Sequence, residues 1–561
     1  MIRILSANLL FVVASVTLLS SAYALNGDTL QLNPRNNWRA FEIITVGDNP
    51  VDDGFDWTMP STFDGLGARL SDASTLRILI NHEISYTTIS EVNINLSSFR
   101  TAISNTINSG STDGASFVTS AREAFERWSS NGGASWINAS DKNNTRFERF
   151  CSGQSYLPHT FGPGRGFVDN IYITGEETFG DFSFNRLFAL DMNNRDFYQL
   201  SGVTGIASGG IGGLPRDSWE NAALLDTGET DHVALLLSPD GGTSRMQLYI
   251  GEKGKDIDGN SSNDFLARNG LAYGSTYYLK GVLPSIGTPS SGTFDTTSTG
   301  ALTASKFEDI DTSPSDPTRV VLGNQDFGLF TFNFDLDFFG GSFSSGSSSF
   351  SLSKIQNDIS NTLGTFGDPD NVDWTAPTVL NGRKYAEGLI FVNEDNSNGE
   401  IWMNAPDGSD LTRIGDTAGN SSATETSGIL DISTLLGYNP GSILLTSNQG
   451  TKSSLSVLIN PYAEMDDADF DGDGDVDGAD FLTWQRSFGA GTLPSVGDAQ
   501  HNGNVDGQDL AVWQAQFGNT SFSSLTAVPE PSSLVFLLVL ACAAAMTPRF
   551  IRSGTVSLIE S

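Results

Sequence analysis

A stretch near the C-terminal end sets carboxylates at the spacing of a calcium-binding loop. From Asp469 the chain reads DFDGDGDVDGAD, with Gly474 at the sixth of these twelve positions. The aspartates at positions 1, 3, 5, 7, 9 and 12 are Asp469, Asp471, Asp473, Asp475, Asp477 and Asp480. EF-hand-type loops hold calcium through oxygen ligands at these positions, and position 6 needs glycine for a sharp turn. Position 7 contributes its backbone carbonyl in such loops, so Asp475 is expected to act through that oxygen.

A second, less acidic copy of this pattern begins 29 residues later. It places Asp498, Gln500, Asn502, Asn504, Asp506 and Asp509 at the same six positions. A helix is predicted after each loop, with Trp484 and Phe488 on one face of the first helix and Trp513 and Phe517 on the second. Calcium is expected in both loops, with the lower affinity in the second, because Gln500 replaces a carboxylate there.

The duplicate resembles the type I dockerin, a small module of two calcium loops with one helix each. The resemblance implies a module over residues 463–520 that docks onto a cohesin-like domain or onto the other half of a surface assembly. The family carries a Ser/Thr recognition pair directly after position 9. Gly478-Ala479 and Gly507-Gln508 stand there instead, so calcium binding is predicted while the docking partner stays open.

Acidic residues also stand repeatedly beside apolar runs in the preceding body of the chain. The patches are Asn81-His82-Glu83, Cys151-Ser152-Gly153, Glu176-Glu177, Glu220-Asn221 and Glu308-Asp309-Ile310. Acids and a thiol at strand ends can converge on one axial metal site. Taken singly, each has a plainer explanation: an acid can be a solvated strand end or a helix cap, and a lone cysteine a small buried apolar side chain.

The order of these patches resembles the PhoX family of secreted alkaline phosphatases, loosely over residues 40–450. The resemblance implies a β-propeller whose central iron–calcium cluster hydrolyses phosphate esters. It also implies a set of candidate ligands, namely Cys151, Glu176, Glu177, Glu220 and Glu308. The chain departs from the family in the longer tract 154–174 between the cysteine and the paired glutamates, and the family's full set of calcium ligands cannot be placed on it.

The elements that must position these residues are short and β-rich. Runs of Val, Ile, Leu, Phe and Tyr recur between turn-forming clusters, at 76–80, 170–174, 186–190, 232–237, 246–250, 328–334, 388–393 and 442–446. They predict an all-β fold, and a propeller-like body over 25–462 is the economical arrangement, although no strict repeat gives the number of blades. One helix is predicted over 116–130, where Phe117, Ala121, Ala124, Phe125 and Trp128 share a face.

Charge and composition narrow the range of functions. Asp and Glu total 66 against 30 Lys and Arg, a formal net charge of -36, so nucleic acid is not an expected partner. This acidity suits calcium, or simply a well-solvated surface. The two cysteines, Cys151 and Cys542, offer no disulfide framework. Four histidines and the lack of a Gly-x-Ser-x-Gly motif argue against a histidine-rich zinc hydrolase and a serine hydrolase.

Both ends are typical of export and sorting segments. Residues 1–24 run from Arg3 through an apolar stretch to Ala22-Tyr23-Ala24, the order of a secretory signal cleaved after Ala24. Within 521–561, Val528-Pro529-Glu530-Pro531 precedes the apolar run 534–546, which resembles the PEP-CTERM sorting signal of Gram-negative bacteria. That resemblance implies an exosortase-type processing enzyme; a plain hydrophobic anchor is the alternative. Either way, the protein is expected outside the cytoplasm, extracellular or on the cell surface.

Three functions remain open at this stage. The first is an exported calcium-binding protein whose PhoX-like propeller is a metal-dependent phosphoesterase. The second is a non-catalytic surface or matrix protein with the dockerin-like module as a calcium staple. The third is a component of polysaccharide degradation, the usual company of dockerins. A bound iron–calcium cluster in the body would exclude a plain scaffold.

Overall fold

The computed structural model describes residues 30–50, 57–141, 146–178, 184–201, 213–357, 359–361, 364–489 and 497–518. The chain divides into two compact units, one ending at Asp466 and also taking in Gln500–Asn504, the other formed by Asp467–Ala499 and the chain from Val505 onward. The proposed signal segment 1–24 and the sorting tail 521–561 lie outside the described residues. Among the described residues, no helix has the length and apolar character to span a membrane.

The first unit consists of sheets arranged as blades, antiparallel except where β7 pairs with β12, and three of them come from its first half. The first blade is β3 (Phe63–Asp72), β4 (Thr75–His82), β5 (Ile89–Asn95) and β6 (Val118–Glu123). The second is β9 (Phe150–Tyr156), β10 (Ile171–Glu176), β11 (Leu187–Asp191) and β12 (Asp196–Gln199), extended by β7 (Arg127–Ser129) and β8 (Ile137–Asn138). The third is β13 (Trp219–Leu225), β14 (His232–Pro239), β16 (Gln247–Glu252) and β17 (Gly274–Lys280).

Three further blades follow. The fourth is β20 (Phe307–Thr312), β21 (Arg319–Asn324), β22 (Gly328–Asp335) and β25 (Ser349–Gln356), joined to the third at its outer edge by β18 (Ser290–Asp295). The fifth is β28 (Pro369–Trp374), β31 (Ile390–Glu394), β32 (Ile401–Asn404) and β33 (Thr412–Asp416), with β1 (Asn33–Pro34) outermost. The sixth is β34 (Glu425–Asp431), β35 (Ile443–Gln449) and β36 (Ser454–Ile459), completed by β2 (Arg39–Thr45).

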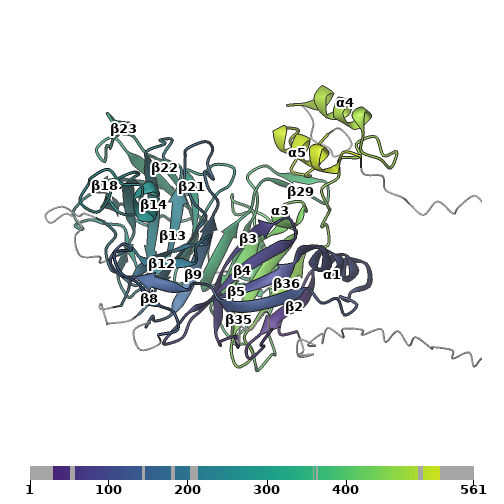
Figure 1. Ribbon diagram of the computed structural model, residues 1–561, viewed down its shortest axis with the longest axis horizontal. Helices are drawn as coiled ribbons and strands as arrows, with labels where there is room; N and C mark the ends of the chain where they lie inside the picture. Colours follow the sequence, from purple (N-terminus) through teal and green to yellow (C-terminus); the bar gives the residue numbers. More distant parts are fainter. Residues whose placement is uncertain are drawn as a thin grey trace, which may run out of the picture. The chain divides into compact units, whose positions relative to one another are not determined.

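These blades close into a ring. The innermost strands β3, β9, β13, β20, β28 and β34 each contact the next, and β34 contacts β3 again. The N-terminal strand β2 pairs with β36, with Arg39 opposite Ile459, so the first and last parts of the body share one sheet (Figure 1). The described residues therefore form a β-propeller with six blades, which confirms the predicted all-β, propeller-like body and supplies the blade number.

The apolar runs form strands because each blade is buried on both faces. Successive residues of a strand point to opposite faces. In β13, Ala222 and Leu224 pack in the core between the second and third blades, whereas Ala223 and Leu225 pack in the core between the third and fourth. A strand buried on both faces needs continuous rather than alternating apolar residues, and this explains the apolar runs in the sequence.

The predicted helix over 116–130 is wrong. That segment forms β6 and β7, and its apolar residues divide between two cores, with Ala121 in one and Phe125 and Trp128 in another. The helical spacing arises because two short strands meet at a bend. A helix lies just upstream instead, α1 (Leu96–Ser109), whose first turn is capped by the Asn95 side chain accepting from the Ser98 amide at 2.9 Å.

Short elements decorate the propeller. They are the helices α2 (Phe265–Arg268) and α3 (Ser433–Leu436), and the strands β15 (Ser244–Arg245), β19 (Thr303–Ala304), β23 (Phe338–Phe339), β24 (Ser342–Phe343), β26 (Ile359–Asn361), β27 (Gly364–Phe366), β29 (Thr378–Leu380) and β30 (Arg383–Tyr385).

The second unit is small and helical. It contains the two predicted helices, α4 (Gly478–Ser487) and α5 (Gly507–Gln516), around a core that includes Phe470 and Val476. Reciprocal hydrogen bonds tie the two halves together: the Trp484 indole donates to the Asp506 carbonyl at 2.7 Å, and the Trp513 indole to the Asp477 carbonyl at 2.8 Å. The duplicated sequence thus forms a duplicated structure.

Candidate metal centre

The innermost strands place one potential metal ligand each at the same position near the propeller axis. In five of the six blades this residue is the second of its inner strand, directly after a buried residue. The five ligand-type residues are Asp64 in β3, Cys151 in β9, Glu220 in β13, Glu308 in β20 and Asp370 in β28. Because the blades are related by rotation about the axis, equivalent positions lie on one ring around it.

A left-handed backbone conformation precedes four of these strands. Thr62, Arg149, Lys306 and Asp368, each the residue just before an inner strand, have φ values of 55°, 43°, 53° and 51°. This conformation costs about 1–2 kcal/mol for a residue other than glycine. Strain of this kind gathers at functional sites, where the rest of the fold holds it in place. In this protein, each strained residue lies directly before an inner strand that carries a candidate ligand.

The ligand atoms form three overlapping groups, each with mutual distances within 4.8 Å. The groups are Asp64, Glu83 and Cys151; Cys151, Glu177 and Glu220; and Glu220, Glu308 and Asp370. Cys151 and Glu220 each belong to two groups. The arrangement is thus a continuous chain of anionic groups rather than separate sites.

Burial makes these groups costly to ionise without cations. Burial and the nearby Asp240 carboxylate raise the pKa of Glu177 to about 7, although Arg149 opposes the shift. Burial and the charges of neighbouring acids raise the pKa values of Glu220 and Glu308 well above the ordinary range. A bound cation reverses this logic by stabilising the charged form of every acid around it.

Unpartnered atoms also fit bound cations. Glu177 Oε1 and Asp240 Oδ1 are buried and have no hydrogen-bond partner among the described residues. A buried carboxylate oxygen without a donor costs free energy unless a proton or a metal ion occupies the vacant direction. The thiol and carboxylate donors suit the predicted metals, since iron accepts sulfur ligands and calcium takes oxygen.

Two half-exposed cations border this chain of acids. Lys306 Nζ lies 2.6 Å from Asp240 Oδ2 and 3.3 Å from Glu308 Oε1. Arg149 pairs with Glu83 and, at 3.2 Å, with Glu177 Oε2. Their side chains keep 31% and 40% of their surface exposed, so both can reach an anion arriving from solvent.

The sixth blade contributes neutral donors instead of a ligand from its inner strand. Ser427 Oγ donates to Asp64 Oδ1 at 2.7 Å, and Gln449 Nε2 donates to Asp64 Oδ2 at 3.0 Å and to Glu83 Oε2 at 2.7 Å. On the other side, Ser152 Oγ donates to Glu220 Oε1 at 2.6 Å. These bonds orient the carboxylates toward the shared centre.

Of the five candidate ligands expected in the body, the structure brings four together. Cys151, Glu177, Glu220 and Glu308 lie in the groups described above. Glu176 does not, because successive residues at the end of β10 point in opposite directions. Its carboxylate pairs with Arg186 at 2.5 Å and 2.7 Å, away from the others.

Sequence reasoning missed Asp64, Asp370 and the ligand role available to Glu83. Asp64 follows Phe63, as Cys151 follows Phe150 and Glu308 follows Phe307, so an aromatic residue followed by a metal-ligand type was a usable signal. Asp370 follows a proline and carries no such signal. His82, in the same patch as Glu83, is buried and hydrogen-bonded to Ser61 and Ser90, and burial lowers its pKa to about 4.

The first calcium loop has the expected grouping of carboxylates. Ligand atoms lie within 4.8 Å of one another in two sets, Asp469 with Asp471 and Asp473, and Asp475 with Asp477 and Asp480. The Asp480 carboxylate is fully buried and accepts hydrogen bonds from the amides of Phe470, at 2.7 Å, and Asp477, at 2.8 Å. Calcium binding at this loop stays a prediction.

The second loop reproduces part of this geometry. Asp509 Oδ2 accepts from the Asp506 amide at 2.8 Å, matching Asp480 in the first loop. Asn502 Oδ1 accepts from the Asn504 amide at 2.8 Å. With Asp498 and Asp509 fully buried and amides at three positions, this loop offers less negative charge than the first.

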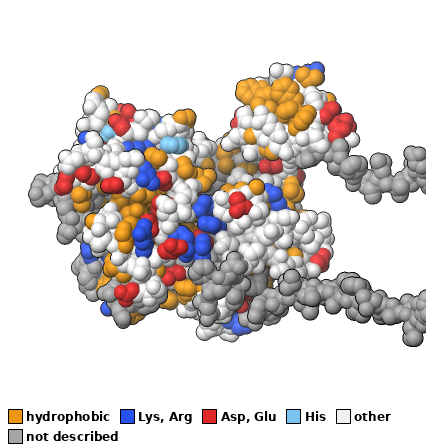
Figure 2. Space-filling view, in the orientation of Figure 1, with side chains coloured by type: hydrophobic (Ala, Val, Ile, Leu, Met, Phe, Trp, Pro, Cys, Tyr) orange, Lys and Arg blue, Asp and Glu red, His pale blue; other side chains and the backbone are white. Residues whose placement is uncertain are grey.

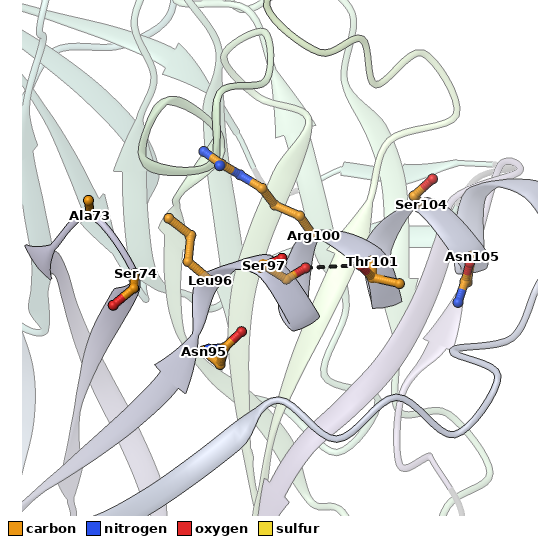
Figure 3. A pocket seen from close by; sticks show the side chains of 9 residues that line it. All are labelled: Ala73, Ser74, Asn95, Leu96, Ser97, Arg100, Thr101, Ser104 and Asn105. Atoms are coloured by element: carbon orange, nitrogen blue, oxygen red, sulfur yellow. Dashed lines mark hydrogen bonds between the residues drawn. The ribbon is translucent and has the colours of Figure 1, made fainter. Parts of the chain in front are cut away.

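A separate hollow of about 430 Å³ lies beside the start of α1 (Figure 3). Its lining is mostly serine, threonine and asparagine, and Arg100 is the one ionisable side chain among its lining residues. Arg100 Nε donates to the Leu436 carbonyl at 2.8 Å, so this cation already has a structural partner. Nothing in the hollow supports acid–base or metal chemistry.

The comparisons with known proteins found only distant structural similarities. No family model and no curated protein matches the sequence. A structure of Pseudomonas fluorescens PhoX in complex with vanadate aligns over 77% of this chain and 96% of that chain, with 11% identity and a TM-score of 0.47. A mutant of AofleA from Arthrobotrys oligospora aligns over 76% of this chain and 90% of its own, with 8% identity and a TM-score of 0.30. The catalytic domain of the Coprinopsis cinerea GH62 α-L-arabinofuranosidase aligns over 76% of this chain and 98% of its own, with 9% identity and a TM-score of 0.29. The assignment of a propeller rests on the strand pairing described above.

Proposed function

We propose that the propeller is a metal-dependent phosphoesterase with an iron–calcium cluster at its axis. The observation that carries this proposal is the chain of three overlapping ligand groups, joined through Cys151 and Glu220. Residues shared between two groups are suited to bridge neighbouring metal ions. Two or more ions held side by side are the arrangement that phosphoryl transfer uses.

The residues divide by ligand chemistry. Cys151 supplies a soft sulfur atom, which favours iron at the groups that contain it. Glu220, Glu308 and Asp370 supply oxygen alone, which favours calcium. When bound, such ions polarise a phosphoryl group and neutralise its charge.

Arg149 and Lys306 border the axial acids and are partly exposed to solvent. Each is held by two carboxylates and still half-exposed, so each can donate to a phosphate oxygen without leaving its partners. Arginine suits this role because its planar guanidinium presents several donors at once. The two side chains would bind and orient the anionic substrate beside the acids.

The test uses the full-length protein purified with its metals. We expect bound iron and calcium by elemental analysis, and hydrolysis of p-nitrophenyl phosphate. Glu220→Gln, which removes an acid shared by two groups, should lose the bound iron and the hydrolysis. Asp113→Asn, which removes one charge from an exposed loop, is the matched control and should keep both. A wild type without bound iron would refute the proposal, and an iron-loaded but inactive one would favour the non-catalytic surface protein.

We propose a second role for the helical unit, as a calcium-stabilised docking module. Its surface carries an apolar patch, in which Leu482, Phe488 and Phe517 are 44%, 56% and 58% exposed (Figure 2). An exposed apolar group of this kind on a small unit is typical of an interaction site. A cohesin-like domain or another half of a surface assembly is the partner that the dockerin resemblance favours.

Export and sorting complete the proposal. A signal at 1–24 and a PEP-CTERM-like tail at 521–561, processed by an exosortase-type enzyme, would carry the protein to the exterior of a Gram-negative-type cell. A role in polysaccharide degradation has no support from the propeller axis, where the acids are joined in one cluster. Mass spectrometry of the secreted protein, locating its two ends, tests this part separately.

A further inference from the structure

The opposite end of the propeller axis carries a second set of acids. Asp311 lies near the end of β20, Asp373 near the end of β28, and Asp431 is the last residue of β34. Asp311 follows Glu308, and Asp373 follows Asp370, by three residues. At about 3.3 Å per residue, that spacing puts the second set roughly 10 Å along the strands from the candidate metal centre.

A hydrogen-bonded layer separates the two sets. Asp309 Oδ2 accepts from the Val372 amide at 3.0 Å, and the Asn221 side chain donates to Asp309 Oδ1. Asn371 Nδ2 donates to Ser152 Oγ at 2.5 Å. These bonds join inner strands from the second to the fifth blade across the axis, so the second set is not an extension of the first.

The second set borders a cavity of about 280 Å³. Besides Asp311, Asp373 and Asp431, its lining includes the hydroxyl-bearing residues Ser313, Thr375 and Thr434. No lysine, arginine or histidine is among the residues that line it. Two buried acids, Asp311 and Asp373, and the partly buried Asp431 therefore share a space with oxygen donors and no balancing positive side chain in its lining.

One of these acids is incompletely paired. Asp311 accepts from the amides of Thr312 and Trp374, both at 2.7 Å. Asp431 accepts from the amides of Ser433, at 2.9 Å, and Gly441, at 2.8 Å. Asp373 accepts from the Asp431 amide, but its Oδ2 atom has no hydrogen-bond partner although the residue is only 7% exposed.

We propose that this cavity is a calcium site, separate from the metal centre and independent of any catalysis there. Asp373 Oδ2 is the direct ligand, and Asp311 and Asp431 supply balancing charge. Calcium fits better than magnesium, because it accepts six to eight oxygen ligands at irregular positions and the cavity has room for its waters. The ion would link the inner strands of the fourth, fifth and sixth blades.

The electrostatics of the three acids agree with this assignment. Burial, opposed by the bond from Trp374 but assisted by the charge of Asp309, raises the pKa of Asp311 to about 7. Burial and the charges of Asp311 and Asp431 raise the pKa of Asp373 well above its ordinary value. A divalent cation would allow all three to ionise together.

The test counts bound calcium in the full-length protein by equilibrium dialysis and follows thermal unfolding. Asp373→Asn keeps the shape of the side chain and should bind one calcium ion fewer than the wild type. It should also lose part of the rise in Tm that calcium produces, while its iron content and phosphatase activity stay unchanged. Glu220→Gln should lose iron and phosphatase activity, which Asp373→Asn keeps, and this difference separates the site from the proposed function.

Equal calcium binding by Asp373→Asn and the wild type would overturn the proposal. If that variant fails to fold, crystals of the wild type soaked in terbium, which replaces calcium in oxygen sites, decide the question. Anomalous density beside Asp373 Oδ2 is the expected result. A cavity that stays empty while terbium fills the calcium loops would equally overturn the proposal.

Discussion

The two candidate metal regions, the propeller axis and the first loop of the helical unit, use similar acids in different ways. The loop draws its carboxylates from twelve consecutive residues, and several of them, including Asp471 and Asp473, are exposed. The axis draws its ligands from five blades, from Asp64 to Asp370, and buries most of them: Cys151 is 5% exposed and Glu220 3%, whereas Asp370 is partly exposed. The loop site is local and exposed to water, whereas the axial site depends on the whole fold and is mostly buried.

This difference predicts how strongly each region depends on its metal. Charges in an exposed loop are screened by water and salt when the ion leaves. Buried charges have no such relief, and an unpaired buried charge costs about 3–5 kcal/mol. Metal removal should therefore affect the propeller axis more than the loop, unless the acids there take up protons.

The largest expected effect comes from neighbouring glutamates at the end of β10. Glu177→Gln removes a ligand of the central group and should reduce both iron content and hydrolysis by about 100-fold. Glu176→Gln, one residue earlier, breaks the pair with Arg186 and should lower Tm while the metal content stays at the wild-type level. Elemental analysis and calorimetry on both variants check this, and equal metal loss in the two would contradict the geometry.

The next effect concerns substrate binding beside the axial acids. Lys306→Met removes a positive charge that borders Glu308 and Asp240. If Lys306 orients a phosphate, KM for p-nitrophenyl phosphate should rise about tenfold with a smaller change in kcat. Lys280→Met, on the outer strand β17 where Lys280 contacts Thr299, is the control and should leave KM unchanged. A fall in kcat alone would assign Lys306 to holding the acids rather than the substrate.

Measuring the Tm of metal-stripped protein at different pH values tests the contrast between the buried axis and the exposed loop. Burial raises the folded-state pKa of Glu177 to about 7, against an ordinary value of 4.5. A raised folded pKa stabilises the fold at low pH, and this contribution is lost as pH rises through the folded pKa. The metal-free propeller should therefore have a lower Tm at pH 8 than at pH 5.5. Adding iron and calcium at pH 8 should restore it, and a Tm that rises with pH in EDTA would contradict this account.

The same contrast explains which features the sequence could reveal. The first loop was predictable because its ligand spacing is contained in one local pattern. The strands were predictable because blades buried on both faces need continuous apolar runs, as in β14. The prediction of a helix over 116–130 was wrong because the apolar residues of two short strands stand at helical spacing.

The assembly of the axis was only partly predictable. Cys151, Glu177, Glu220 and Glu308 stand in recognisable patches, but the choice between Glu176 and Glu177 depends on which of two successive side chains turns inward. Asp370 depends on a ring of strands that no local pattern encodes. The left-handed residues before the inner strands, such as Arg149 and Lys306, are not glycines and so leave no signal in the sequence.

The smallest expected effect compares the two calcium loops with each other. Asp480 and Asp509 are equivalent acids at position 12, both fully buried and both accepting from the amide of the position 9 residue. Asp480→Ala should lower the calcium affinity of the helical unit by about tenfold more than Asp509→Ala, because the first loop concentrates more negative charge on its ion.

Limited proteolysis of the full-length protein, with cleavage inside 467–518 followed over a calcium titration, measures this difference in affinity. Both variants should keep the iron content of the wild type, because the axis draws none of its ligands from these loops. Equal calcium midpoints would mean that the amides of the second loop coordinate as well as the carboxylates of the first, and a loss of iron in either variant would break the separation between the two regions.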